Sequence, residues 1–563
     1  MLKKIKKIPK IYWLLLMVFL IGSIGIFYNY GLYGPDEKHA VHSVLKFFRD
    51  FSLADKYSSF FPPVILLEIP FAVLMFLAYL LLGIGGISQL KELVIVDNYI
   101  FFPFFRLIII IVAAATVFIF YKVCLKVFKK ERPSLIAAFL LATSLLFAQR
   151  AHIDTTWMIQ TMVLMAAIYY FLTLLEKEEW GIGVFLISAL FIFLSVQIEP
   201  VGLIAIVPFF LIFWLKRKKA KIGQEGLKLC LFFLVIAALL VVSFYSNPVT
   251  FKTYFSVADT ALRPVALSLD FSRSFYGQGL AHRILAFWET LFYLEPLLFA
   301  LFIGGIIVAY KRDKFLLKIF GSYIAVYYFT LGPLMGGMSE KRLMPVIPAF
   351  AVFAALFIEF LMEKYQRKSF RKFVYAGLLV FIANPLIFDY ALLKSSSPIE
   401  ARNWIIKNIP ADSSVFDTCW LELNENKNVI NLIKERYPEF STTKQRYLLE
   451  RPYLLDLRKN YFVVSDYHLA NQMDKNKFKY LVVCFYDDTQ KQEILASFQE
   501  ILAFFKDREK IKIYDSLAGR QKFPALNMFE LTRFFKDEEK FSLKRLFNLP
   551  YNGPHIEIYQ FLN

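Results

Sequence analysis

Residues 105–123, FRLIIIIVAAATVFIFYKV, form a long apolar block with an arginine near its start and a lysine near its end. The block is close to the ~20 residues that an α-helix needs to cross the roughly 30 Å hydrocarbon core of a bilayer. Because a backbone in lipid must satisfy its own hydrogen bonds, such a block is expected to be helical. Similar blocks at residues 11–28 and 227–245 predict a membrane protein with several helical spans.

The composition agrees with this interpretation. Of 563 residues, 58% are hydrophobic, and the mean hydropathy is +0.50, which excludes an ordinary soluble globule. The net charge of +19 comes from lysines and arginines that lie in short clusters between the apolar blocks. No basic stripe with interleaved aromatic residues occurs, so we expect no nucleic-acid partner. The clusters are interpreted as topology determinants on the cytoplasmic side of the plasma (inner) membrane.

Charge clusters also predict the number of spans. The clusters interpreted as cytoplasmic are residues 3–10, 126–132, 216–221, 311–318 and 364–372. The first precedes an apolar run too long for a cleaved signal peptide, so it marks a signal anchor with a cytoplasmic N-terminus. Two cytoplasmic clusters must be separated by an even number of crossings, yet three apolar blocks lie between the first two.

The block at residues 62–82 is the one interpreted as not crossing, because it contains Pro62, Pro63, Glu68 and Pro70. We expect it to be re-entrant or to lie on the surface, within a long first external loop at residues 30–104. The remaining blocks are residues 11–29, 101–123, 134–149, 157–175, 182–198, 200–215, 227–245, 288–310, 315–333, 345–362 and 373–393. They predict about eleven spans and an external C-terminal tail.

The composition changes at Ser395, where charged and amide residues become frequent. We expect residues 1–393 to form the membrane module and residues 394–563 an extracytoplasmic α/β domain. Its expected helices are residues 398–408 and 490–506, and its expected strands are residues 414–419, 461–465, 479–486 and 510–514. Cys124 and Cys230 are expected to be inert packing residues. A disulfide between Cys419 and Cys484 stays open.

The first candidate functional residues follow the first span. Asp36 and Glu37 are adjacent carboxylates near the expected membrane surface, where they are candidates for a catalytic base or for ligands of a divalent metal. The alternative is a turn, because Gly-Pro-Asp is ordinary turn chemistry and Asp36 or Glu37 would cap a following helix.

A second cluster, Gln149-Arg-Ala-His-Ile-Asp154, is expected in a short external loop at residues 150–156. Arg150 and Asp154 are four apart and can pair on one helical face, either as an anchor between helix ends or as part of a polar site. His152 fits a hydrogen-bonding role at the boundary as well as a ligand role. Glu199, in a tight hairpin before Pro200, is equally ambiguous.

A third cluster includes Lys341 and Arg342 before the span that begins near Met344. It fits a solvated external turn. It also fits an anion site, because Arg342 at a helix N-terminus can bind a phosphate together with the free backbone N–H groups.

In this order, the clusters resemble the GT-C superfamily of glycosyltransferases, and in particular the protein O-mannosyltransferases and lipid A aminoarabinose transferases. The resemblance extends over most of the membrane part. The elements that carry it are Pro35-Asp36-Glu37, Phe61-Pro-Pro63, Arg106, Arg150 with Asp154, Arg342 with Pro345 and Pro348, and the tail segments at residues 401–404 and 408–410.

The resemblance implies a transferase that moves a sugar from a polyprenyl-phosphate carrier to a protein, lipid or glycan acceptor on the outer face, with inversion. Asp36 would be the general base, with Glu37 beside it. Asp154 would position the reactants, while Arg342, Arg150 and Lys341 would stabilise the departing phosphate. Membrane lipids surround the module, and the carrier's isoprenoid tail would lie in an apolar groove between spans.

One departure from the family pattern is Glu199, which stands where many relatives carry a lysine before the hairpin proline. Glu199 would instead contact a sugar hydroxyl or a metal. Two rival classes stay open. A lipid or polysaccharide flippase or transporter predicts repeated halves and buried mid-span charges, whereas a non-catalytic scaffold would only present the tail.

Overall fold

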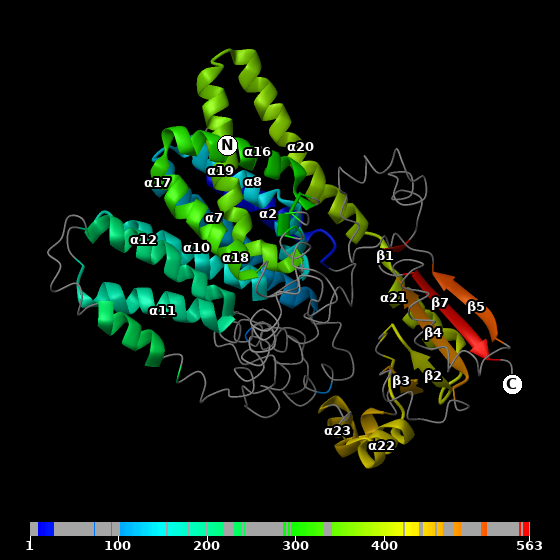
Figure 1. The fold of residues 1–563 in the computed structure, drawn as a ribbon. Helices are drawn as coiled ribbons and strands as arrows, with labels where there is room; N and C mark the ends of the chain where they lie inside the picture. Colours follow the sequence, from blue (N-terminus) through cyan, green and yellow to red (C-terminus); the bar gives the residue numbers. More distant parts are fainter. Residues whose placement is uncertain are drawn as a thin grey trace, which may run out of the picture.

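The structure is a computed structural model of the whole chain. It describes residues 9–26, 73, 92, 102–153, 156–177, 180–198, 200–217, 229–238, 241, 285, 287–288, 291–292, 294–331, 340–419, 421, 423–438, 443–455, 459–465, 478–485, 508–514, 551–552 and 555–561. In Figure 1 the helices of the first two thirds of the chain gather into one bundle, with a β-sheet beside it. The predicted segment at residues 62–82 lies outside the described residues, apart from Val73.

The described bundle is helical throughout. Its α-helices are α2 (Lys10–Ser23), α7 (Phe102–Phe128), α8 (Glu131–Ala142), α9 (Leu145–Ile153), α10 (Thr156–Leu174), α11 (Ile182–Ile198), α12 (Ile206–Arg217), α16 (Pro296–Arg312), α17 (Lys314–Leu316), α18 (Ser322–Leu331), α19 (Ile347–Lys364) and α20 (Lys368–Leu392). Two 3-10 helices, η3 (Pro200–Ala205) and η5 (Glu340–Val346), precede α12 and α19, and a π-helical turn, η4 (Leu317–Gly321), precedes α18.

Four described helices are long and apolar enough to cross a membrane, and α8 with α9 adds a fifth if the bent pair is one span. They are Pro103–Phe128, Thr156–Leu174, Arg342–Lys364 and Lys368–Tyr390. The chain is therefore a polytopic helical membrane protein. The count of about eleven spans stays a prediction.

Helix α7 lies at the centre of the bundle, packed against α2, α8 and α10. Its buried residues Ile109, Ala113 and Val117 recur at the spacing of one helical face, whereas Ile111 is exposed. Helices α16 and α19 approach closely at Gly305, where a Cβ atom would lie 2.0 Å from the carbonyl oxygen of Phe353. Small residues at such contacts let the backbones of membrane helices touch.

We expected the apolar block at residues 134–149 to form a single span. It is instead broken, because α8 and α9 meet at an angle of 58°. The break is stabilised from a distant part of the chain. One carboxylate oxygen of Glu295, Oε1, accepts hydrogen bonds from Ser144 Oγ at 2.6 Å and from the backbone N–H of Leu146 at 2.9 Å. The buried Glu295 thus caps the N-terminus of α9 together with Ser144, whose Oγ accepts a hydrogen bond from the backbone N–H of Phe147 at 3.2 Å.

Replacing Glu295 with leucine should destabilise the protein by about 2 kcal/mol, because the buried N–H of Leu146 would lose its acceptor. Replacement with glutamine should cost less, since the amide oxygen can accept the same two hydrogen bonds. Thermal unfolding in detergent would measure both. Equal stability of the leucine variant and the unchanged protein would contradict the capping role.

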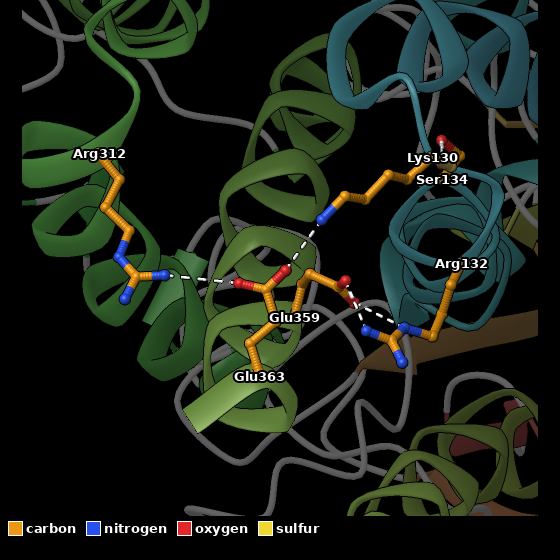
Figure 2. A network of polar contacts seen from close by, with 6 residues as sticks. All are labelled: Lys130, Arg132, Ser134, Arg312, Glu359 and Glu363. Carbon is orange, nitrogen blue, oxygen red and sulfur yellow. Dashed lines mark hydrogen bonds and ion pairs between the residues drawn. The ribbon is translucent and has the colours of Figure 1, made fainter. Parts of the chain in front are cut away.

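One end of the bundle carries a network of ion pairs (Figure 2). Arg132, at the start of α8, donates two hydrogen bonds to Glu359 of α19, at 2.8 and 2.6 Å. One turn further along α19, Glu363 pairs with Lys130 at 2.9 Å and with Arg312 of α16 at 3.5 Å. The network therefore connects three helices that are far apart in the sequence.

Further basic residues lie at the same end. Lys126, near the end of α7, pairs with Glu176 just beyond α10, and Lys216 of α12 donates to the carbonyl of Lys177. The basic clusters at residues 126–132, 216–221 and 311–318 thus contribute side chains to one end of the bundle, as an even number of crossings requires.

The tail forms an α/β fold. Its helices are α21 (Ser397–Asn408), α22 (Lys427–Arg436) and α23 (Thr443–Glu450), with a 3-10 turn, η7, at Pro452–Leu454. The five-stranded sheet has the order β3-β2-β4-β7-β5, from β2 (Ser414–Asp417), β3 (Phe462–Val464), β4 (Tyr480–Phe485), β5 (Arg508–Tyr514) and β7 (His555–Phe561). Strand β2 is parallel to β3 and β4, whereas β7 is antiparallel to β4 and β5.

A two-stranded parallel pair, β1 (Ser395–Ser396) with β6 (Tyr551–Asn552), lies where α20 reaches the sheet (Figure 1). The predicted strands coincide with β2 to β5 and the first predicted helix with α21, but β7 was not predicted. The helix expected at residues 490–506 lies outside the described residues.

The cysteines are free thiols in the structure. Cys124 is buried as predicted, but Cys230 is exposed, so the packing role expected for it is wrong. Cys419 and Cys484 contact each other. Burial raises the pKa of the Cys419 thiol, and its hydrogen bond with Cys484 raises it further.

Candidate active site

The candidate site is built around the C-terminal half of α9, where about one helical turn places three polar side chains inside the bundle. Gln149, Arg150 and His152 are all buried. Arg150 and His152 were expected in an external loop, and that expectation is wrong because α9 continues to Ile153. Helix α9 packs against α2, α7, α20 and η5, so these polar side chains lie among four other elements.

His152 connects three of these elements. Its Nδ1 lies 2.7 Å from the carbonyl oxygen of Ala148 in α9 itself, and its Nε2 lies 3.3 Å from the carbonyl oxygen of Ile21 in α2. The same Nε2 lies 3.4 Å from Oδ1 of Asp389 in α20. The ring of Phe388 packs edge-on against the imidazole.

Arg342 lies in η5, which packs against both α9 and α10. Two buried tyrosines of α18 fix this 3-10 helix: the hydroxyl of Tyr327 donates to the carbonyl of Arg342, and the hydroxyl of Tyr323 donates to the carbonyl of Pro345 at 3.0 Å. The backbone around Arg342 is therefore held in place, while its side chain is only partly buried.

Arg106 belongs to the same region. It lies in the first turns of α7, is 3% exposed, and acts electrostatically on His152. The sequence resemblance includes Arg106, but it was not among the predicted site residues.

The other predicted site residues, Asp36, Glu37, Asp154 and Glu199, lie outside the described residues, as does the side chain of Lys341. Their neighbours in the sequence are described. Asp154 directly follows the last residue of α9, and Glu199 stands between α11 and η3. Both η3 and η5 pack against α10 and α18. Helix η3, which directly follows Glu199, and helix η5, which contains Arg342, therefore share two packing partners.

The two ends of the bundle differ in chemistry. Helix α7 has Arg106 near its start and Lys126 near its end, and the segment from η5 to α19 runs from Arg342 to Glu363. The polar cluster around α9 and the ion-pair network of Figure 2 thus lie at opposite ends of the same helices. Among the described residues, no group of three or more His, Cys, Asp or Glu side chains could hold a metal.

Two further buried polar residues were not among the predicted site residues, although Gln149 begins the second sequence cluster. Gln149 is 0% exposed, and within the described part of the chain neither atom of its amide group has a hydrogen-bond partner. Asp389 is 1% exposed within α20, and neither of its carboxyl oxygens has a conventional hydrogen bond to a described residue. An ionisable residue inside a span is a functional-site hypothesis by default. The sequence alone could have indicated Asp389, since this ionisable residue lies inside the block predicted as the last span.

Comparison with known proteins gives few matches. No family model matches the chain, and no curated protein matches it. Among solved structures, the chain is similar to ArnT from Cupriavidus metallidurans bound to undecaprenyl phosphate, with 12% identity and a TM-score of 0.49 over 89% of this chain and 96% of that chain. The apo state of the same protein gives 11% identity and a TM-score of 0.43 over the same shares.

Proposed function

We propose that the chain is a GT-C glycosyltransferase that moves a sugar from a polyprenyl-phosphate carrier to an acceptor on the extracytoplasmic face of the membrane. One observation carries the proposal. The buried cluster of α9 and the Arg342 segment η5 pack together at one end of the bundle, beside the points where the segments with Asp154 and Glu199 begin.

This arrangement suits transfer from a lipid phosphate. Asp36 deprotonates the acceptor hydroxyl, which attacks the anomeric carbon and displaces the carrier phosphate with inversion. Arg342 and Arg150 supply positive charge for the leaving phosphate, with Lys341 beside them, and Asp154 orients the sugar. Asp36 and Glu37 are the residues to which a divalent metal would bind if the reaction needs one.

The orientation in the membrane is inferred from the end of the bundle opposite to α9. If the basic clusters at that end face the cytoplasm, the α9 end and the tail domain lie outside and the N-terminus lies inside. The donor then reaches the site laterally from the outer leaflet, and a protein, lipid or glycan acceptor approaches from outside.

The test is a transfer assay with the full chain reconstituted in vesicles that contain undecaprenyl-phosphate-linked sugars, with mannose and aminoarabinose donors in parallel. The expected result is release of undecaprenyl phosphate and labelling of an added acceptor. If donor lipid moves between leaflets without release of the phosphate, the chain is a flippase instead.

A further inference from the structure

The side chain of Asp389 has an unusual environment. It lies in the last turns of α20, is almost fully buried, and has one polar side chain nearby, at 3.4 Å: His152. A carboxylate that leaves water costs far more free energy than a neutral acid unless donors surround it. Neither oxygen of Asp389 receives a hydrogen bond from a donor in the segments that the structure describes.

The contacts of His152 fix its tautomer. Its Nδ1 lies 2.7 Å from the Ala148 carbonyl, an acceptor, so Nδ1 must carry a hydrogen and donate it. In a neutral imidazole Nε2 is then an acceptor. It faces the carbonyl oxygen of Ile21 and Oδ1 of Asp389, and the carbonyl of Ile24 also lies close to the ring, so that without a further proton Nε2 meets only acceptors.

One proton gives Nε2 and Asp389 a hydrogen bond, and it has two places to reside. On His152 it would make an imidazolium and leave Asp389 as a buried carboxylate, and the positive charge of Arg106 opposes that state. On Asp389 it makes a neutral acid that donates to Nε2. The distance of 3.4 Å is at the long end for a hydrogen bond, and rotation of the Asp389 carboxyl group can shorten it.

We propose that Asp389 is a protonated acid which donates a hydrogen bond to His152, and that this pair positions the catalytic end of the bundle. It joins α20 to α9 directly, and α2 packs against both of these helices. In the sequence, Asp154 stands two residues beyond His152, and Asp36 follows α2. The pair therefore fixes the described residues that lead to both candidate carboxylates.

The role in catalysis rests on the proposed function, so the experiment has an arm that does not. The first arm compares Asp389→Asn and Asp389→Leu in the transfer assay. Asparagine can donate from Nδ2 to His152 and should keep kcat within about 3-fold of the unchanged protein. Leucine cannot donate, and a displacement of the reacting groups should lower kcat by about 10²-fold with little change in the KM for donor.

The control is Leu386→Ala, one turn earlier on the exposed face of α20, which should change neither constant. Unchanged kcat in the leucine variant would overturn the positioning role. If the Asp389→Asn variant loses as much activity as the Asp389→Leu variant, the neutral-acid assignment is overturned, because the negative charge of Asp389 is then needed.

The second arm uses infrared spectroscopy of the full chain and needs no activity. The spectrum of the unchanged protein minus that of Asp389→Asn should contain the carbonyl band of a protonated carboxylic acid. A carboxylate band in its place would overturn the assignment. If the acid band is present while no donor is ever cleaved, the proton assignment stands and the proposed function fails.

Discussion

Replacement of Asp36 with asparagine is expected to lower kcat for sugar transfer by about 10² to 10⁴-fold, the usual contribution of a positioned general base. Asparagine has almost the same shape as aspartate but cannot take a proton from the acceptor hydroxyl. The donor should still bind, because the proposed function assigns its phosphate to Arg342 and Arg150 and not to Asp36. We therefore expect a large effect on kcat and a small effect on the KM for donor.

The matched control is Glu37→Gln, which changes the adjacent carboxylate in the same way. If Asp36 is the base, the Glu37 variant should retain most of its activity. If the two carboxylates together hold a divalent metal, both variants should fail and a chelator should inactivate the unchanged protein. Normal turnover by the Asp36 variant would remove this residue from the role of base.

The sequence predicted the spans that depend only on their own residues. Helices α7, α10, α19 and α20 follow from apolar length alone, since a segment of about 20 residues has no other stable conformation in lipid. The break between α8 and α9 could not be predicted in this way. It depends on Glu295, which meets Ser144 and Leu146 only after the bundle has formed.

The site shows the same limit. Arg150, His152 and Arg342 could be proposed because charged residues at span ends are unusual, and the structure brings α9 and η5 together. Asp389 was not predicted, because it lies inside an apolar span and its partner His152 is remote in the sequence. A search for ionisable residues within predicted spans would have found it.

In the tail, β7 was missed although its isoleucines alternate as in a strand. Its Glu557 interrupts the apolar pattern, yet this residue is buried in the sheet, where Lys510 of β5 pairs with it at 2.7 Å. A buried charge of this kind can be predicted only when the strand that carries its partner is known.

The second large effect is expected in the ion-pair network. Replacing Arg132 with methionine should lower the free energy of unfolding by about 2–3 kcal/mol, which is less than the usual cost for a fully buried ion pair because the Arg132 side chain is 39% exposed and water screens the pair. The reason is Glu359, whose side chain is 8% exposed and receives two hydrogen bonds from Arg132. The substitution leaves that carboxylate buried without its guanidinium.

Thermal unfolding in detergent, followed by intrinsic fluorescence, would measure the loss, with Lys126→Met as the matched control. Lys126 also loses an ion pair, but its partner Glu176 is 63% exposed and water can solvate the carboxylate that remains. The control should therefore cost no more than about 1 kcal/mol.

The double variant Arg132→Met with Glu359→Leu separates the two contributions. Apolar side chains of similar volume restore packing and remove the unpaired charge, so most of the lost stability should return. If the double variant is as unstable as Arg132→Met alone, the guanidinium contributes mainly by packing α8 against α19. If Arg132→Met alone has no effect, Glu359 is solvated or protonated without its partner, and the network does not hold this end of the bundle together.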